Sequence, residues 1–223
     1  SERFAAAYGS PAPFASPSYL AAYDTPLLSA AHRDRLLAWA RDPLHGAAVF
    51  TARPSLPPAD LDGAPPHGFA PEGELAVELL GLDGRMPLIG QGRIKWLADR
   101  AGRPVSDYIK PAPVQALAAI AAAASGTERA ALESAANLVE RGTLTGPLAG
   151  LAGGPTRVIV YEDSAGGIRA VERAAEYLRQ AGLSVTVEGI GVSPHADKRE
   201  ALAQVAGRVV DTIDEGIEPI IAE

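Results

Sequence analysis

The stretch Val158-Ile159-Val160-Tyr161-Glu162-Asp163-Ser164-Ala165-Gly166-Gly167-Ile168-Arg169 contains the features that decide the fold. It begins with β-branched and aromatic residues, which predict a short buried strand. Two adjacent carboxylates follow, and a pair of glycines then leads into an amphipathic pattern over residues 168–181. The order is a strand, an acidic turn and a helix, and this is the unit from which parallel sheets are built.

The acidic turn lies where α/β proteins place their chemistry. Ligands of open parallel sheets bind outside the carboxyl ends of the strands, so Glu162 and Asp163 are expected at such a place. Two carboxylates there suit a hard divalent cation such as Mg2+, which prefers oxygen ligands. The simpler interpretation is that Asp163 or Ser164 caps the following helix. Both interpretations stay open on this stretch alone.

Composition limits the class of protein. The chain has 223 residues, of which 47% are hydrophobic, and this is enough for one substantial α/β domain with its own core. Its net charge of −7 argues against a nucleic-acid partner, whose binding proteins are normally basic. The absence of cysteine excludes disulfides, thiolate zinc sites and cysteine nucleophiles. No apolar run reaches the roughly 18 residues needed to cross a bilayer, and no signal peptide opens the chain, so we expect a cytoplasmic protein without a membrane partner.

The rest of the chain alternates between helical and strand patterns. Helices are expected over residues 29–41, 71–80, 91–101, 114–124, 128–141, 168–181 and 196–206, and strands over residues 47–50, 158–161, 183–187 and 208–210. The remaining segments are a proline-rich loop over residues 55–71, a flexible glycine-rich connector over residues 142–155 and a tail helix or coil over residues 213–222.

This alternation predicts an α/β fold with a doubly wound, Rossmann-like parallel sheet and helices on both faces. Residues 1–46 form an N-terminal helical, loop-rich segment that can serve as an accessory lobe, and residues 47–223 form the core. Gly90-Gln91-Gly92 resembles the start of a dinucleotide-binding fingerprint. No strand-type run leads directly into it and the third glycine is missing, so it is a weak signal for a nucleotide.

Three polar features lie at or beside the carboxyl ends of expected strands. They are Thr51 after Val49-Phe50, Lys110 before Pro111, and Glu162-Asp163 after Val160-Tyr161. Their order resembles the haloacid dehalogenase superfamily. That family's second motif, a strand ending in Thr or Ser, is matched by Val49-Phe50-Thr51. Its third motif, a lysine often followed by proline, is matched by Lys110-Pro111, and its fourth, a strand ending in paired acids, by Val160-Tyr161-Glu162-Asp163-Ser164. Together the matches cover about residues 47–214.

The resemblance implies a phosphohydrolase that acts with Mg2+ on a small phosphorylated metabolite. Asp163 would hold the metal, with Glu162 as a co-ligand or as support for the ligand. Lys110 would be the catalytic cation that neutralises developing charge on the phosphoryl group.

The resemblance also implies a phosphate site after the first expected strand. The Thr51 hydroxyl and the Ala52 backbone N–H would hold a phosphoryl oxygen. Arg53 would add a phosphate or substrate contact, although a salt bridge to a surface acid is an equally good interpretation of this residue.

This sequence departs from the family pattern at the first motif. The family's first motif is a strand ending in Asp-x-Asp, which supplies the nucleophile, and residues 1–50 contain no such strand. The acids Asp211 and Asp214 follow a strand-like run but are three residues apart, and they lie in the wrong part of the chain. The missing strand is central in that fold, so its absence leaves a hole in the sheet's hydrogen bonding that another strand must fill.

Three hypotheses follow. The strand comes from a segment outside this sequence and the protein is a phosphatase, or the protein is a non-catalytic binding or scaffolding member of the same family. A third hypothesis is an unrelated sugar- or nucleotide-binding α/β protein. The third predicts that Lys110 and Asp163 lie far apart, whereas the first two require them to border one cleft.

Overall fold

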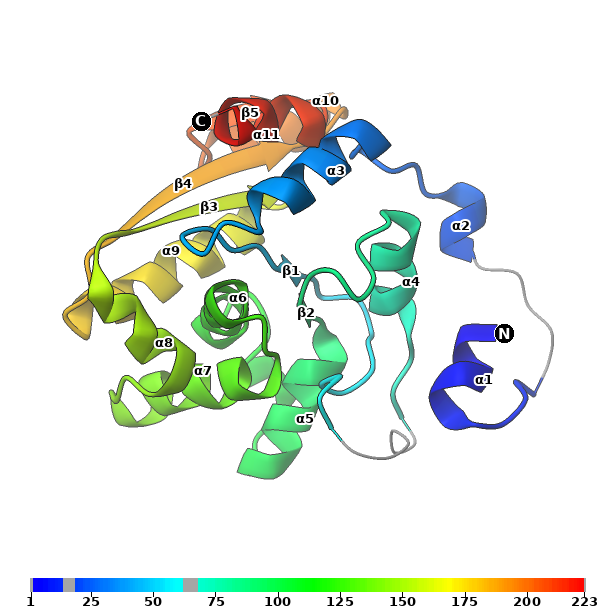
Figure 1. The fold of residues 1–223 in the computed structure, drawn as a ribbon, viewed down its shortest axis with the longest axis horizontal. Coiled ribbons are helices and arrows are strands. Elements are labelled where there is room, and N and C mark those ends of the chain that lie inside the picture. Colours follow the sequence, from blue (N-terminus) through cyan, green and yellow to red (C-terminus); the bar gives the residue numbers. More distant parts are fainter. Residues whose placement is uncertain (1, 14–18, 62–67, 223) are drawn as a thin grey trace.

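A computed structural model of the protein describes residues 2–13, 19–61 and 68–222 (Figure 1). These residues contain two short 3-10 turns, Val105–Asp107 and Leu151–Gly153, in addition to α-helices and strands. The helices are α1 (Glu2–Tyr8), α2 (Tyr19–Tyr23), α3 (Ala30–Trp39), α4 (Glu72–Leu79), α5 (Gln91–Ala101), α6 (Pro113–Ser125), α7 (Arg129–Arg141), α8 (Gly146–Gly150), α9 (Ala165–Gln180), α10 (Ala196–Ala203) and α11 (Ile213–Ile221).

The strands of the described residues form two separate parallel sheets. In the first, β1 (Val49–Phe50) pairs with β2 (Leu88–Ile89). In the second, β4 (Val185–Val192) lies between β3 (Thr156–Glu162) and β5 (Arg208–Val210). The predicted α/β class and the parallel pairing are therefore confirmed, but no ladder joins the two sheets into one.

Local sequence signals explain where several helices begin and end. The Ser29 side chain caps α3 by accepting a hydrogen bond from the His32 N–H at 3.3 Å. Pro113 occupies the first turn of α6, where its missing N–H costs nothing. Gly102 ends α5 in the left-handed conformation, with φ of 64°. The expected helices are thus present, with small shifts at their ends.

Three expectations about local structure are wrong. Residues 142–155 are not merely a connector, because they contain α8 and a 3-10 turn. A strand does lead into Gly90-Gln91-Gly92, since β2 ends at Ile89. The strand expected over residues 183–187 continues to Val192 through two glycines, which have a packing role.

The glycines of β4 allow helices to lie close to the sheet. A Cβ atom at Gly189 would lie 2.9 Å from Ile168 of α9, and one at Gly191 would lie 2.9 Å from Leu202 of α10. Side chains would hold both helices away from the strand, so glycine here supports the strand's packing rather than ending it.

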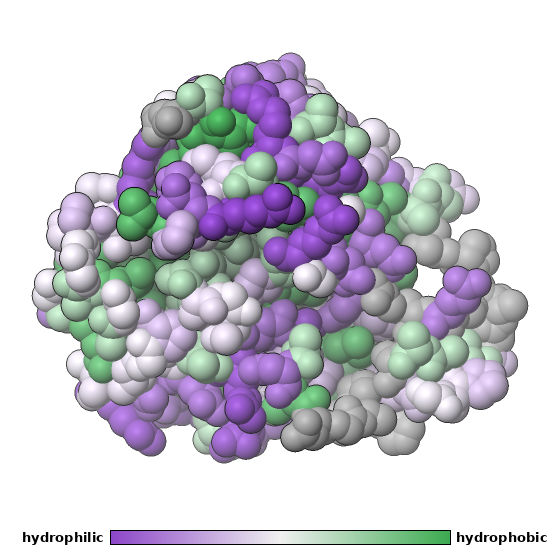
Figure 2. Space-filling model, viewed as in Figure 1, coloured by the Kyte–Doolittle hydropathy of each residue, from purple (hydrophilic) through white to green (hydrophobic). Residues whose placement is uncertain are grey.

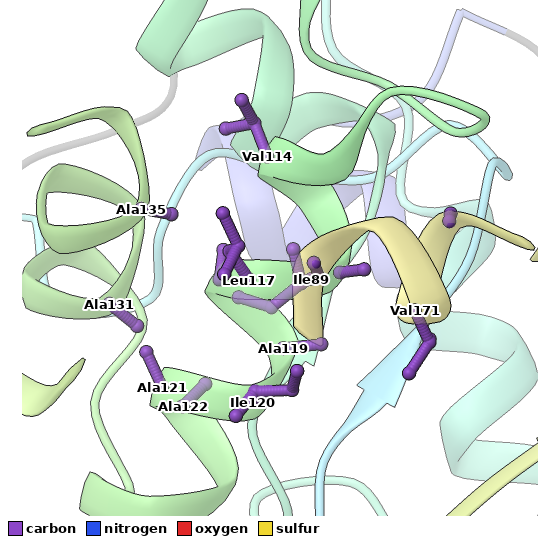
Figure 3. Close-up of a cluster of buried hydrophobic side chains, with 14 of the residues drawn as sticks. Ile89, Val114, Leu117, Ala119, Ile120, Ala121, Ala122, Ala131, Ala135 and Val171 are labelled. Atoms are coloured by element: carbon purple, nitrogen blue, oxygen red, sulfur yellow. The ribbon is translucent and has the colours of Figure 1, made fainter. Parts of the chain in front are cut away.

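Apolar side chains cover both faces of both sheets. On one face Phe50, Ile89 and Val160 belong to one cluster with α5, α6, α7 and α9, which we call the α6–α9 layer. Figure 3 shows α6 in this layer, with Leu117 close to Ile89 and Ala121 directed toward Ala131 of α7. On the other face Val49 and Tyr161 belong to a cluster with α3, α4 and α11, which we call the α3–α11 layer. Because each layer takes residues from both sheets, the two sheets lie within one three-layer arrangement.

The outer surface of α3 is strongly polar, and Figure 2 shows hydrophilic residues gathered over this helix. Arg35 and His32 of α3 both pair with Glu218 of α11, at 2.6 and 2.9 Å. These contacts hold α3 against α11. Within the described residues, no helix has both the length and the apolar character needed to cross a membrane.

Candidate functional site

Lys110 connects the carboxyl ends of the two sheets. Its Nζ donates a hydrogen bond to Glu162 Oε1, although the two residues are 52 positions apart in the chain. The same ammonium group lies 4.9 Å from the centroid of the Phe50 ring, a cation–π contact. Phe50 is the last residue of β1 and Glu162 the last of β3. One cation thus touches the ends of two strands that belong to different sheets.

The Glu162 carboxylate is buried and fully engaged. Its side chain is 5% exposed, and its Oε1 accepts from Lys110. Its Oε2 accepts from the Ser164 N–H at 3.2 Å and from the Ser164 hydroxyl at 2.9 Å. A buried carboxylate needs such partners, because an unpaired charge in this position would be very costly.

Ser164 has a second role as the cap of α9. Its Oγ accepts from the Gly167 N–H at 3.2 Å, so the capping interpretation is confirmed for Ser164. Gly167 also lies against the Glu162 side chain. A Cβ atom at position 167 would lie 2.1 Å from the Glu162 Cδ, whereas one at Gly166 would meet open space. The second glycine of the pair is therefore what makes room for the carboxylate.

Asp163 takes a different partner from its neighbour. Its carboxylate lies 3.0 Å from Lys198 Nζ in α10, and 65% of its side chain is exposed. Partial burial raises the pKa of Asp163, but the Lys198 hydrogen bond and the charges of Lys198 and Lys110 outweigh burial and hold the pKa below its usual range. The hydrogen bond and charge of Asp163 in turn raise the pKa of Lys198. The two predicted metal ligands thus differ, one buried and engaged by Lys110, the other exposed and held by Lys198.

The predicted phosphate-binding residues follow β1 in a turn. The Thr51 Oγ1 accepts from the Arg53 N–H at 3.2 Å, and Ala52 is exposed at the tip of the turn. The Arg53 guanidinium pairs with Asp24 at 3.0 Å, which is the surface salt bridge considered from the sequence. Thr51 directly follows Phe50, so the turn begins next to the residue that Lys110 covers.

Gln115 is a site residue that the sequence did not reveal. It is fully buried in α6, and its side-chain amide donates to the carbonyl of Thr51 at 2.8 Å and to that of Ile89 at 2.9 Å. Its Oε1 accepts from the Lys110 N–H at 3.2 Å. The sequence does contain one signal for this role. Gln115 is the single polar side chain in the otherwise apolar run Val114–Ala124, and a buried polar side chain needs hydrogen-bond partners.

The carboxylates of the site fit Mg2+ only together with water and substrate oxygens. In the described part of the chain, no group of three or more His, Asp and Glu side chains is arranged to hold a metal. Mg2+ usually keeps several waters and binds one or two carboxylates together with substrate phosphates. Both Glu162 oxygens have donors, so Asp163 is the carboxylate with oxygens open to solvent. The residues fit an ion held by Asp163, water and substrate oxygens, with Glu162 as support.

The best-formed cavity of the described residues lies away from the charged groups described above. A cavity of about 330 Å³ lies near the amino ends of β3 and β4, and it is lined by Leu151, Ala152, Gly154, Pro155, Gly182, Leu183 and Ser184. None of these residues titrates. The charged groups described above lie at the carboxyl ends, where α/β folds bind their ligands.

Comparison with known proteins adds no assignment. Neither a family model nor a curated protein nor a solved structure matches the chain.

Proposed function

We propose that this protein is a haloacid-dehalogenase-like phosphohydrolase that acts with Mg2+ on a small phosphorylated metabolite. The observation that carries the proposal is the pairing of Lys110 with Glu162 beside the end of β1. The hypothesis of an unrelated α/β protein expects Lys110 to lie far from Asp163. Lys110 instead pairs with Glu162, the residue before Asp163 in the acidic turn, and its charge lowers the pKa of Asp163. The proximity of Lys110 to this turn therefore favours the two family hypotheses over that one.

Each group of the site has a role in phosphoryl transfer. The Lys110 ammonium, held by Glu162, neutralises negative charge on the phosphoryl group as the transition state forms. The Thr51 hydroxyl and the Ala52 N–H bind a phosphoryl oxygen at the end of β1. Asp163 holds the metal, and Mg2+ supplies further neutralisation of phosphoryl charge when bound. Arg53 reaches a phosphate once it leaves Asp24, because that contact is exposed.

A second candidate function is phosphate binding without hydrolysis. It is favoured by the lack, within residues 1–50, of a strand that leads into an Asp-x-Asp pair. The Glu162 carboxylate is not an alternative nucleophile in the structure, because both of its oxygens accept hydrogen bonds. Binding needs only the cations and the N–H groups, whereas hydrolysis also needs a free carboxylate.

Hydrolysis of p-nitrophenyl phosphate, with Mg2+ and with EDTA, tests the proposal. We expect turnover that EDTA abolishes, and a loss of about 10²-fold or more in kcat for Lys110→Ala, as when an electrostatic contact to the transition state is removed. Lys95→Ala is the matched control, since Lys95 makes an exposed pair with Asp99. Asp163→Asn should lose Mg2+ dependence, while Asp197→Asn, exposed one position before Lys198, should not.

Phosphate binding followed by ³¹P NMR separates the two candidates. Mg2+-dependent binding without turnover would favour the non-catalytic function. No turnover and no binding would contradict both.

A further inference from the structure

We propose that Lys198 competes with Mg2+ for the Asp163 carboxylate, so that this lysine sets the affinity for the metal and makes metal and phosphate bind cooperatively. The inference rests on the proposed function in one respect, since it takes Asp163 as the metal ligand. It deepens that function by assigning a role to a residue outside the three matched motifs.

The start of α10 places Lys198 beside the acidic turn. β3 and β4 are parallel neighbours, so the turns that follow them lie at the same end of the sheet. Arg199, the next residue, donates to the Ser193 carbonyl at 3.1 Å and pairs with Asp211. These contacts tie the first turn of α10 to the ends of β4 and β5, while the Lys198 ammonium group reaches Asp163 at 3.0 Å.

The charged groups at the acidic turn balance before any metal binds. The Lys110 ammonium pairs with Glu162 and the Lys198 ammonium with Asp163, one cation for each carboxylate. Both ammonium groups also lower the pKa of Asp163, so both act on its carboxylate. A divalent cation on Asp163 would add two uncompensated positive charges beside them. Repulsion among these charges disfavours the metal, unless an ammonium group leaves or an anion arrives.

Burial decides which ammonium group leaves. The Lys110 side chain is 17% exposed and that of Glu162 is 5% exposed, so separating this pair would leave a buried charge unpaired. The side chains of Lys198 and Asp163 are 49% and 65% exposed, and water can replace each partner at little cost. Lys198 is therefore the cation that leaves when the carboxylate binds a metal.

Displacement of Lys198 links the metal to phosphate. The lysine stays on α10 after it leaves Asp163, so its charge remains near the carboxylate. A phosphate group bound by the Thr51 turn and Lys110 brings negative charge that offsets the repulsion. Phosphate should therefore raise the affinity for Mg2+, and by reciprocity Mg2+ should raise the affinity for phosphate.

Isothermal titration of the full chain with Mg2+, at low ionic strength, tests the competition. We expect Lys198→Met to bind Mg2+ about fivefold more tightly, because an exposed ion pair no longer has to separate. Lys198→Arg keeps a cation on Asp163 and should stay within about twofold of the unaltered protein. The matched control is Arg173→Met, since the exposed Arg173 donates to the Pro111 carbonyl at 3.1 Å rather than to a carboxylate. This control should change the affinity by less than about twofold, because a charge that does not touch Asp163 is screened.

Inorganic phosphate added to the same titrations tests the coupling. We expect phosphate to raise the Mg2+ affinity of the unaltered protein about fivefold more than that of Lys198→Met. Free phosphate complexes Mg2+ equally in both titrations, so the difference between the two proteins reports the coupling alone. Equal effects of phosphate in the two proteins would contradict it. Turnover is not measured, so the result is the same for either candidate function.

Three further results would overturn the proposal. One is equal Mg2+ affinity in the unaltered protein and Lys198→Met while Asp163→Asn abolishes binding, which would leave Asp163 as the metal ligand. Another is weaker binding in Lys198→Met, because the lysine would then support the metal. The third is Mg2+ binding that Asp163→Asn does not change, or no binding in any variant, which would contradict the metal assignment of the proposed function as well.

Discussion

The two carboxylate oxygens of Glu162 fix much of the geometry of the site. Its carboxylate accepts from Lys110 and twice from Ser164, and it lies against the helix that Ser164 caps. The motif of strand, acids and glycines predicted the strand, the cap and the acidic turn. It did not predict that the two acids separate toward Lys110 and Lys198. That choice depends on residues 52 and 35 positions away, which no local pattern contains.

Replacing Gly167 tests the packing of Glu162. In Gly167→Ala the new methyl group overlaps the Glu162 carboxylate, so we expect a loss of about 1–3 kcal/mol in the free energy of unfolding. On the proposed function, turnover falls as well, because Lys110 loses its partner. Gly166→Ala is the control, and it should change the free energy by less than about 1 kcal/mol. Equal effects of the two substitutions in urea unfolding would contradict this account.

The pKa of Asp163 should depend on Lys198. In Lys198→Met we expect this pKa to rise, since burial is then opposed only by the charge of Lys110 and the hydrogen bond with Glu162. Carboxyl NMR titration measures the change, and an unaltered pKa would show that Lys198 does not hold Asp163.

The same pair gives stability a predictable pH dependence. Because the folded pKa of Asp163 is lowered, the stabilisation is present above its unfolded pKa near 3.8 and is lost as pH falls through the folded value. Both side chains are largely exposed, so the contribution stays below about 1 kcal/mol. The Lys198→Met variant should therefore lose little free energy of unfolding at neutral pH. On acidification, its free energy of unfolding should decrease less than that of the unaltered protein.

At the scale of elements, helices were easier to predict than strands. Caps such as Ser29 and Gly102 act within a few residues, so the sequence contains them. The strands β1 and β2 have two residues each, and distant side chains hold them. Gln115 binds their carbonyls, and Glu128 accepts from the Leu88 N–H at 2.9 Å.

A buried ionic network joins α4, α5 and the start of α7. Arg93 pairs with Glu74 and with Glu128, and its side chain is 4% exposed. Arg93→Met should cost about 3–5 kcal/mol in the free energy of unfolding, because two buried carboxylates lose their cation. Lys95→Met is the control, and its exposed pair with Asp99 should contribute less than about 1 kcal/mol. Urea unfolding of both variants measures the difference, and a small loss in Arg93→Met would mean that water reaches the carboxylates.

At the scale of the whole molecule, the two sheets share their apolar layers. The sequence predicted the α/β class and the parallel direction of the strands, because alternating helix and strand patterns are present along the chain. It predicted one sheet, and the described residues form two.

We expect the molecule to unfold in one transition. The α6–α9 layer takes side chains from both sheets, so one sheet cannot lose its packing without the other. Trp96 packs against that layer, whereas Trp39 packs in a cluster with Ile190 and Val210. Urea unfolding followed by fluorescence of the variants Trp39→Phe and Trp96→Phe, and by circular dichroism, should give coincident curves. Separate midpoints would show that the sheets are independent units.

Gln115 links the backbone of Lys110 to the ends of β1 and β2. One amide group binds the carbonyls of Thr51 and Ile89 and also the N–H of Lys110, so the position of β1 and that of the lysine are not independent. A ligand that fixes the Thr51 turn would therefore also restrict Lys110. On the proposed function, the turn and the lysine bind the same phosphate, so contact with one would orient the other before it binds.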